Sequence, residues 1–414
     1  MANLALTEHH DLRTGDPPWD DARWDVPASD ALPDARVDVA IIGAGISGSI
    51  IAERLSETGM SVLLLDRRAP GLGSTAASTA QVMWAMDVPL SELAADLGFD
   101  EAARRWRRVY RAVRGLAERM DVLGIDGERR DCPTVYLEGP ILDADALAKE
   151  AELHRKAGLP SEFLDAGSVA SRFGIAPRAA IASSGGFSID PVKTAHGMLE
   201  VARAHGARVC HPVDVVSLTS REDGVSLSLA GGEVVEASTV VLANGYERAA
   251  LFLPPAFSLL STFVMATAPG VAPAWRENAM IWEAADPYLY LRSDTEGRII
   301  AGGEDIDFAE ERARDALIGT KAGTIAAKTR ALLQGREVAV ERTWAAMFGS
   351  SPDGLPAIGQ TATMQNVWLA AGFGGNGIAF SALAAELLTS ALTGNPDPDA
   401  DAFDPYRFND SDHR

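Results

Sequence analysis

One stretch near the N-terminus, residues 37–66, constrains the fold more than any other part of the chain. It opens on an apolar run, Val39–Ile42, which has the length and β-branched content of a buried strand. Apolar residues at helical spacing follow until Gly59, and a second apolar run, Val62–Leu65, completes the stretch. Two buried strands joined by one helix are typical of a parallel strand–helix–strand unit, so the stretch predicts an α/β fold.

The turn between the first strand and the helix carries the glycine pattern GxGxxG. Gly43 makes the tight turn, Gly45 lets a phosphate approach the backbone, and Gly48 lets the helix pack against the strand. The N-terminus of the helix points free N–H groups and its positive dipole end at a pyrophosphate. Asp66, after the second strand, can accept both hydroxyls of an adenosine ribose. The pattern predicts a dinucleotide site rather than glycines used for packing alone, and it does not separate FAD from NAD.

The composition narrows the class of protein and of partner. With 414 residues the chain is long enough for two domains, and its net charge of −21 argues against nucleic acid or an anionic membrane as a partner. Cys132 and Cys210 form no CxxC pattern, which excludes a disulfide framework and a zinc site, and we expect no bound metal. Residues 1–35 are too polar for a secretory signal, and the longest uncharged apolar stretch, Val39–Ala52, is too short to span a membrane. A cytoplasmic protein is expected.

Three segments are less specific. Residues 1–35 contain several prolines and read as an extended arm, which Trp19 and Trp24 pin to the body. Residues 73–81, GSTAASTAQ, are small or hydroxyl-bearing and can lie against a flat or phosphorylated ligand, although a plain surface loop has the same composition. Residues 396–414 form an acidic tail.

A long amphipathic helix or helix pair is predicted for Ser91–Leu123. Its apolar positions share one face, and six arginines lie off that face: Arg104, Arg105, Arg107, Arg108, Arg111 and Arg114. An arginine run can indicate nucleic-acid binding, but acidic residues surround this one. We therefore expect a solvated helical face.

The rest of the chain alternates between strands and helices. Further helices are predicted at Asp143–Ala157, Pro191–His205, Ala309–Leu333 and Ile378–Leu392. Strands are predicted at Thr134–Leu137, Arg208–Cys210, Val213–Leu218, Val225–Leu229, Val234–Val235, Thr239–Ala243, Thr262–Thr267, Tyr288–Arg292, Arg298–Gly302, Glu341–Phe348 and Asn366–Ala371.

Four motifs in combination resemble the D-amino-acid oxidase superfamily of FAD enzymes, above all its glycine oxidase, sarcosine oxidase and gamma-glutamylputrescine oxidoreductase branches. The first motif is GxGxxG with Asp66. The second is residues 73–81, similar to a segment that crosses the pyrophosphate and reaches the isoalloxazine. The third joins the strand start at Val213, which in the family meets the adenine, to residues 243–245. The fourth joins residues 353–356 to residues 372–378, similar to segments under the flavin pyrimidine.

The resemblance implies an α/β architecture, α+β overall, with a Rossmann-type FAD-binding domain and an inserted antiparallel-sheet-plus-helix substrate domain. The expected division is an arm at 1–35, a discontinuous FAD-binding domain at 36–90, 190–250 and 340–395, a substrate domain at 91–189 and 251–339, and a tail at 396–414. The residues that it implies for FAD are Gly43, Gly45, Ile46, Ser47, Gly48, Asp66, Arg67, Arg68, Gly73, Ser74, Thr75, Thr79, Ala80, Gln81, Val213, Ala243, Asn244, Gly245, Gly372, Gly374, Gly375, Asn376, Gly377 and Ile378.

Two departures from the family pattern matter. Ala346 stands where sarcosine oxidase has a cysteine that holds the flavin covalently, and the early loop carries no histidine, so we expect non-covalent FAD. The lysine that promotes reaction with oxygen in that branch has no counterpart in the matching stretch, Gly297–Ile300. The electron acceptor is therefore open between oxygen and another molecule.

The family's chemistry is hydride transfer from the carbon beside an amine nitrogen to flavin N5, giving an imine that water hydrolyses. Tyr288, Tyr290 and Arg292 alternate on one predicted strand and so share a face, and Arg298 begins the next strand. We expect Tyr290, Arg292 and Arg298 to position the substrate, because an arginine can clamp a carboxylate; pairing with Asp294 or Glu296 is the alternative for Arg298. The expected pocket is lined by Met83, Trp84, Trp282, Tyr288, Trp344 and Phe373, although core packing explains large side chains of this kind equally well.

Two other functions remain open at this point. One is an NAD(P)-dependent dehydrogenase, and the other is a flavoprotein subunit that acts with a partner chain. The expected partners are a small amine or amino acid and an electron acceptor, with no nucleic acid and no membrane. The sequence names neither the amine nor the oligomeric state, and a homo-oligomer is one option.

Overall fold

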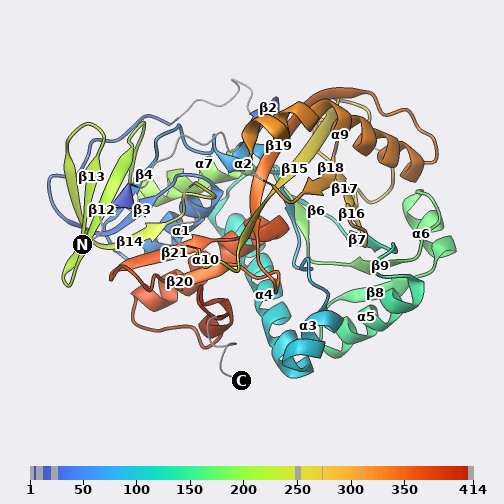
Figure 1. Cartoon of the computed structure of the whole chain (residues 1–414), viewed down its shortest axis with the longest axis horizontal. Helices are drawn as coiled ribbons and strands as arrows, with labels where there is room; N and C mark the ends of the chain where they lie inside the picture. Colours follow the sequence, from blue (N-terminus) through green and yellow to red (C-terminus); the bar gives the residue numbers. More distant parts are fainter. Residues whose placement is uncertain are drawn as a thin grey trace.

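The computed structural model describes residues 4–5, 13–19, 27–247, 253–272, 274–308 and 310–408. Two large sheets stand side by side, and the long helix α4 (Phe99–Leu123) runs between them (Figure 1). No helix in the described part of the chain is both long and apolar enough to cross a membrane.

The first sheet is parallel at its centre. Its parallel strands lie in the order β11 (Arg208–Cys210), β4 (Val62–Leu65), β3 (Val37–Ile42), β14 (Val234–Leu242) and β21 (Val367–Ala371). Antiparallel strands extend it: β12 (Val215–Arg221) and β13 (Gly224–Leu229) pair outward from the first half of β14, β1 (Leu4–Ala5) pairs with β12, and β20 (Ala357–Gln360) pairs with β21. A parallel sheet with crossover helices between its strands is the Rossmann-type arrangement, and the predicted fold class is confirmed.

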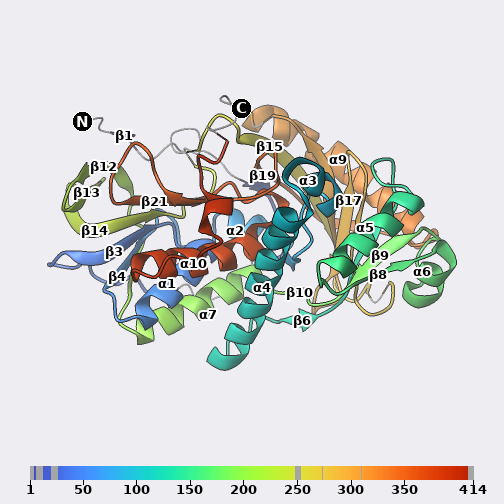
Figure 2. The ribbon, with the colours of Figure 1, turned by 90° about the horizontal axis from the view of Figure 1, so that it is seen from below.

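Successive side chains of β3 point to opposite faces of this sheet, and both faces are covered by apolar residues. Val39 and Ile41 pack toward α1 (Ile46–Glu57), α7 (Pro191–Ala204) and α10 (Gly377–Leu392), which lie together on one face of the sheet (Figure 2). Ala40 and Ile42 pack toward the opposite face, against apolar side chains of β12 and β13. The helix α4 packs against α10 in the same core.

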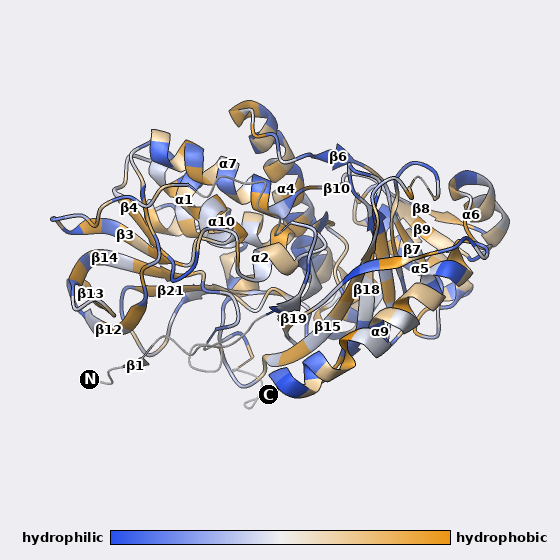
Figure 3. Ribbon diagram, turned by 90° about the horizontal axis from the view of Figure 1, so that it is seen from above, coloured by the Kyte–Doolittle hydropathy of each residue, from blue (hydrophilic) through white to orange (hydrophobic). Residues whose placement is uncertain are grey.

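The second sheet is antiparallel except at one junction. Its order is β2 (Arg13–Gly15), β19 (Val340–Ser350), β15 (Ser258–Thr267), β18 (Ile299–Ile306), β17 (Leu289–Ser293), β16 (Met280–Glu283), β7 (Thr134–Leu137), β9 (Ala180–Ser183) and β8 (Ser161–Leu164), with β16 and β7 parallel. The helix α9 (Glu311–Leu332) packs on β15, β18 and β19, and α6 (Ala166–Phe173) adds Val169 and Phe173 to the same core. Apolar colours run along strands of both sheets in Figure 3, whereas α9 mixes polar and apolar residues.

The opposite face of the second sheet joins the two halves of the molecule. Val264, Ile300 and Trp344 pack there against Val192 of α7 and the short helix α2 (Ser74–Ala77). Smaller elements complete the fold: α3 (Leu90–Leu97), α5 (Ala144–Lys156), the 3-10 helices η1 (Gly374–Asn376) and η2 (Ala400–Phe403), and a small sheet of β5 (Gln81–Val82), β10 (Phe187–Ser188) and β6 (Arg130–Asp131).

Several local expectations differ from the structure. The predicted helix pair divides into α3 and α4 at Gly98, whose φ of +82° favours glycine. The two strands expected at 234–235 and 239–243 are one continuous strand, β14. The sequence analysis did not identify β8, β9, β10, β16 or β20, all of which are short. In the arm, Trp19 is buried and donates from Nε1 to the Ser78 carbonyl at 2.8 Å, whereas Trp24 lies outside the described residues.

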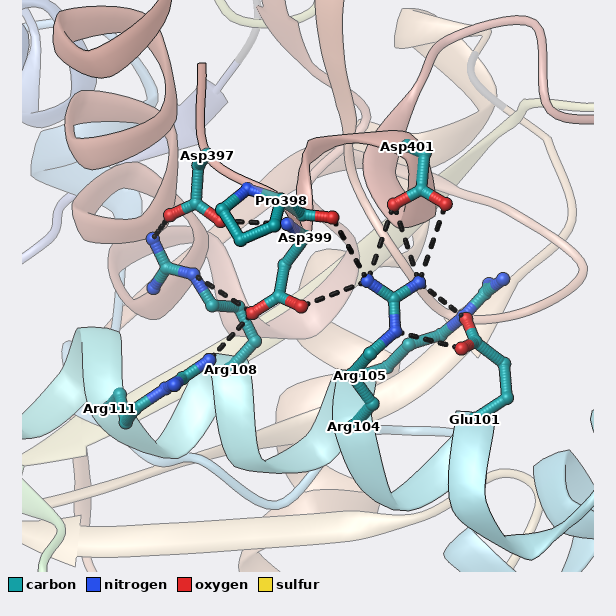
Figure 4. A network of polar contacts seen from close by, with 9 residues as sticks. All are labelled: Glu101, Arg104, Arg105, Arg108, Arg111, Asp397, Pro398, Asp399 and Asp401. Carbon is teal, nitrogen blue, oxygen red and sulfur yellow. Dashed lines mark hydrogen bonds and ion pairs between the residues drawn. The ribbon is translucent and has the colours of Figure 1, made fainter. Parts of the chain in front are cut away.

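The interpretation of the α4 arginines as a solvated face was wrong for Arg108, whereas Arg107 and Arg111 are exposed. Figure 4 shows that the acidic tail lies along this face. Arg108 is buried and pairs with Glu386 of α10 at 2.8 Å and with Asp397 at 3.0 Å, while Arg104 and Arg111 pair with Asp399. The sequence pattern could not show this, because the tail returns to α4 from the far end of the chain.

Candidate cofactor and substrate site

An elongated cavity runs between the two halves of the molecule. One side is built by the N-terminus of α1 and by segments 66–68, 73–81, 213–215, 243–247 and 370–378. The second sheet closes its other end with Thr262, Trp282, Tyr288, Tyr290 and residues 346–348. We call the region near Asp66 and Val213 the adenosine end, and the region closed by the second sheet the substrate end.

The turn from β3 into α1 is packed too tightly for any residue but glycine. A Cβ on Gly43 would lie 2.3 Å from the Ala243 carbonyl oxygen, and the φ of this residue is +110°. A Cβ on Gly48 would lie 1.9 Å from the carbonyl oxygen of Gly43. These close approaches bring the first turn of α1 against the strand and leave the N–H groups at its start facing the cavity.

The carboxylate of Asp66 is fixed by two backbone hydrogen bonds. Its Oδ2 accepts from the Ala44 N–H at 2.7 Å, and its Oδ1 accepts from the Arg68 N–H at 2.8 Å. Next to it, Arg67 pairs with Glu247 at 2.8 Å, and Arg68 pairs with the same carboxylate. The adenosine end thus has an oriented acceptor and two guanidinium groups that Glu247 holds in place.

Segment 73–81 lines the cavity, and hydrogen bonds to other segments hold it in place. Thr75 Oγ1 accepts from the Ile46 N–H at 2.9 Å, which ties α2 to the start of α1. Trp344 Nε1 donates to the Ala77 carbonyl at 2.9 Å, next to the bond from Trp19 to Ser78. The residues on this segment therefore form one wall of the cavity rather than a mobile surface loop.

Asp87 connects this wall to the glycine-rich segment before α10. Its Oδ2 accepts from the Gly375 N–H at 3.1 Å, and its Oδ1 lies 3.4 Å from Asn376 Nδ2. Asp87 lines the cavity and is exposed to solvent there, although protein atoms crowd around its carboxylate. Burial among protein atoms raises the pKa of this carboxyl above its ordinary range, and the Gly375 N–H partly opposes that rise.

Aromatic side chains form the substrate end. Trp282 on β16 and Tyr290 on β17 are direct cross-strand partners, and the Tyr288 and Tyr290 ring centroids lie 5.7 Å apart. Trp282 also stacks on Tyr136 at a centroid distance of 3.8 Å, which fixes the plane of its indole. Burial raises the pKa of both Tyr288 and Tyr290, so both phenols stay neutral near neutral pH.

Several buried polar atoms that line the cavity have no hydrogen-bond partner among the described residues. They are Ser74 Oγ, Gln81 Oε1, Asp214 Oδ1, Thr262 Oγ1, Trp282 Nε1 and Asn376 Oδ1. Because buried polar groups are almost always paired, this distribution along the whole cavity indicates a polar ligand that spans it. An extended dinucleotide fits that requirement, with phosphates at the start of α1 and a ring system at the substrate end.

The cavity collects most of the residues that the sequence analysis named. All of the residues proposed for FAD line it except Gly48, which is covered by the Gly43 carbonyl. Of the proposed substrate residues, Met83, Trp282, Tyr288, Tyr290 and Phe373 line it, whereas Trp84 and Trp344 are buried beneath the wall.

The two arginines proposed to hold a substrate carboxylate lie elsewhere. Arg292 is buried, donates from Nη2 to the Ile189 carbonyl at 2.8 Å, and stacks over Trp19 at 5.0 Å. Its burial lowers the pKa of the guanidinium to about 10. Arg298 pairs with Asp294 at 3.0 Å and with Glu296 at 2.8 Å. Neither is among the residues that line the cavity.

Sequence reasoning missed some lining residues, chiefly Asp87, Tyr246, Glu247, Thr262 and Phe348. Tyr246 and Glu247 directly follow the motif at residues 243–245, so that motif could have indicated them. No sequence signal marked Asp87 or Phe348. Among the described residues no group of His, Cys, Asp or Glu is arranged to hold a metal ion.

Comparison with known proteins decides the class. Residues 38–391 match the model of a family described as FAD dependent oxidoreductase. The chain belongs to this family. Its cofactor is FAD.

Relatives agree with this assignment. Glycine oxidase from Bacillus licheniformis is 24% identical over 371 residues, which cover 87% of this chain and 94% of the relative. Probable oxidoreductase OrdL from Haemophilus influenzae is 22% identical over 378 residues, covering 87% of this chain and 84% of the relative.

Two solved structures share the fold of the oxidoreductase. L-proline dehydrogenase from P. horikoshii aligns with a TM-score of 0.75 at 19% identity, over 91% of this chain and 99% of that chain. Glycine oxidase from Geobacillus kaustophilus aligns with a TM-score of 0.71 at 20% identity, over 90% of this chain and 98% of that chain.

Proposed function

We propose that this FAD-dependent oxidoreductase oxidises an amine or an amino acid at the carbon that bears the nitrogen. The observation that carries the proposal is the continuity of the cavity, which leads from the phosphate-binding turn to an end walled by Tyr288, Tyr290 and Trp282. The α1 turn and segments 73–81 and 372–378 would hold the FAD, which would accept a hydride from a substrate bound at this end. Relatives named glycine oxidase and L-proline dehydrogenase support a substrate with a C–H next to nitrogen.

The bound flavin supplies the two-electron chemistry by accepting a hydride from the substrate carbon. In that step the C–H bond breaks, the nitrogen lone pair forms a C=N bond, and the nitrogen loses a proton. Water then hydrolyses the imine to a carbonyl compound and ammonia or the smaller amine.

The protein contributes position and exclusion of water rather than an acid–base relay. Cross-strand packing of Trp282 on Tyr290 and stacking of Trp282 on Tyr136 hold the rings in place, so they can keep the reacting carbon at a fixed distance. Residues of η1 and the N-terminus of α10 line the cavity, where backbone N–H groups other than that of Gly375 would stabilise negative charge on a reduced ring.

We propose that the FAD is held without a covalent bond. Ala346 lines the cavity at the position that the sequence comparison assigned to a flavin-bearing cysteine, and Cys132 and Cys210 are buried away from it. Denaturation in trichloroacetic acid followed by centrifugation tests this. Flavin absorbance is expected in the supernatant, and absorbance in the pellet would contradict the proposal.

The activity is tested by the visible spectrum of the holoprotein, recorded anaerobically before and after the addition of amines and amino acids. Bleaching of the flavin band by one compound, with release of the matching carbonyl product, is the expected result. A protein whose bound flavin is reduced by dithionite but by no amine or amino acid would contradict the proposal.

A further inference from the structure

The charge of the substrate end limits which nitrogen compounds it can take. Two carboxylates lie close to this region: Asp87 lines the cavity, and Asp305 on β18 is next to Tyr288 but is not itself among the lining residues. Tyr288 and Thr262 lie next to Asp305, whose Oδ1 has no hydrogen-bond partner among the described residues. Burial raises the pKa of Asp305 to about 6, and electrostatic repulsion from the Asp87 carboxylate adds to that rise.

Positive side chains are directed away from this end. Among the described residues that line the cavity, the only cationic side chains are Arg67 and Arg68, which lie at the adenosine end and pair with Glu247. The guanidinium of Arg292 stacks on the Trp19 ring, and Arg298 forms ion pairs with Asp294 and Glu296. A substrate carboxylate at the substrate end would therefore face the Asp87 carboxylate, with Asp305 close behind the lining residues, and no cation among the described residues that line this end.

A cationic amine meets the opposite situation. Its charge is attracted by the Asp87 and Asp305 carboxylates, and the faces of Tyr288, Tyr290, Trp282 and Phe373 offer cation–π contacts. The aromatic walls also suit the aliphatic part of such a molecule. Attraction of the ammonium group and repulsion of a carboxylate therefore both favour an amine over an amino acid.

We propose that the substrate end is selective for an aliphatic amine with no carboxylate on the carbon that bears the nitrogen. This inference rests on the proposed function and names its substrate class. Starting from the ammonium form, the nitrogen releases one proton to water, the neutral amine transfers a hydride from carbon to FAD, and water cleaves the resulting imine to an aldehyde and ammonium.

Matched compounds that differ only by a carboxylate test the reaction. The holoprotein is mixed anaerobically with methylamine or glycine, cadaverine or either enantiomer of lysine, and phenethylamine or either enantiomer of phenylalanine. We expect the amine of at least one pair to bleach the flavin about tenfold or more faster than its amino acid, at equal concentration. Faster bleaching by the amino acid of a reactive pair would overturn the inference and leave the proposed function standing.

Ligands that cannot be oxidised test the site without turnover. Benzyltrimethylammonium and phenylacetate have similar aromatic parts and opposite charges, and their binding is followed by the perturbation of the flavin spectrum. Binding of the cation alone is expected, whereas binding of phenylacetate alone would overturn the inference. Binding of the cation by a protein that oxidises neither an amine nor an amino acid would contradict the proposed function and leave the cation-selective site intact.

Variants test whether Asp87 and Asp305 cause the selectivity. Asp87→Asn keeps an acceptor for the Gly375 N–H but loses the charge, and it is expected to weaken benzyltrimethylammonium binding about tenfold. Asp305→Asn serves as the second variant if Asp87→Asn fails to retain flavin. Asp96→Asn, an exposed position on α3, changes the net charge equally and is expected to leave binding unchanged. Equal effects of all three variants would show that the selectivity is a property of the overall charge, and would overturn the assignment.

Discussion

At the scale of single residues, the site divides into a part that is local in sequence and a part that only the fold assembles. Gly43 and Gly48 act through backbone contacts within one motif, so their packing roles were predictable from spacing alone, while the ribose contact expected of Asp66 stays a prediction. Asp87 could not be predicted, because it meets Gly375 across a separation of 288 residues. Arg292 was expected at the substrate because it alternates with Tyr290, but alternation fixes the face of a strand and not the neighbour that covers it.

Asp305 gives a pH-dependent prediction at this scale. Burial raises its pKa from 3.8 to about 6, so the folded apoprotein binds this proton more tightly than the unfolded chain does. The groups around it are the Thr262 hydroxyl from β15, the Tyr288 hydroxyl, and the carboxylates of Asp87 and Asp286, none of which supplies a compensating positive charge. The stabilising contribution is therefore complete below pH 4 and is lost as the pH rises through about 6.

Asp305→Asn removes this titration. Relative to the unmodified apoprotein, the free energy of unfolding of the variant should increase between pH 4.5 and pH 7.5, by at most about 3 kcal/mol. Urea unfolding at the two pH values measures the change. Asp307→Asn, at an exposed position two residues further along, is the control and should show no such dependence. A constant difference between Asp305→Asn and the unmodified protein would contradict the pKa assignment.

At the scale of elements, long periodic segments were predicted well and short strands were not. β3, β4 and α5 agree with their expected ranges to within two residues at each end, because strong apolar runs and a capping aspartate mark them. The strands β16 and β20 have four residues each and carry too little pattern to stand out from loops. The continuity of β14 was missed because the polar residues in its middle resemble a break, whereas Ala237 at this point pairs with both β13 and β3.

The packing of α1 on β3 can be tested as an element contact. In Gly48→Ala the new methyl carbon would lie 1.9 Å from the Gly43 carbonyl oxygen, so the helix must move away from the strand. We expect a loss of about 2 kcal/mol or more in the free energy of unfolding, together with FAD binding weakened about tenfold or more. Chemical denaturation of the apoprotein and titration of apoprotein with FAD measure the two effects.

A glycine without such a contact provides the control for this variant. Gly323 lies on the exposed side of α9, and a Cβ there would have no atom within 4 Å. Gly323→Ala should leave FAD binding unchanged and stabilise the protein by up to about 1 kcal/mol, because alanine is the better helix former. If Gly48→Ala retains flavin as well as Gly323→Ala does, the close approach of helix and strand is not required for binding.

At the scale of the whole molecule, the C-terminal segment links α4 to α10 and to the loop at Asp353. Arg407 donates to both oxygens of Asp353, at 2.8 and 2.7 Å, and Phe403 is fully buried. The tail acids meet the arginines of α4 along the same path (Figure 4). Composition alone predicted an acidic tail and a basic helix face, but their pairing depends on the position of the chain end after α10, which no local pattern contains.

Two arginines of this network allow a buried ion pair to be compared with an exposed one. Arg108 and Arg111 lie on the same helix and approach the same Asp399 oxygen, but their side chains are 5% and 62% exposed. In Arg108→Met the carboxylates of Glu386 and Asp397 lose a buried partner, and we expect a loss of about 3 kcal/mol in the free energy of unfolding. In Arg111→Met the lost pair is open to solvent, and we expect a loss below about 1 kcal/mol.

Urea unfolding of both variants at low and high salt measures the difference. Raising the salt concentration should abolish the small effect of Arg111→Met, because ions screen an exposed pair, and should leave most of the effect of Arg108→Met. Equal losses in the two variants would mean that the tail is held by its overall charge. A large loss confined to Arg108→Met would mean that this buried guanidinium, placed between α10 and the tail, holds the C-terminal segment against α4.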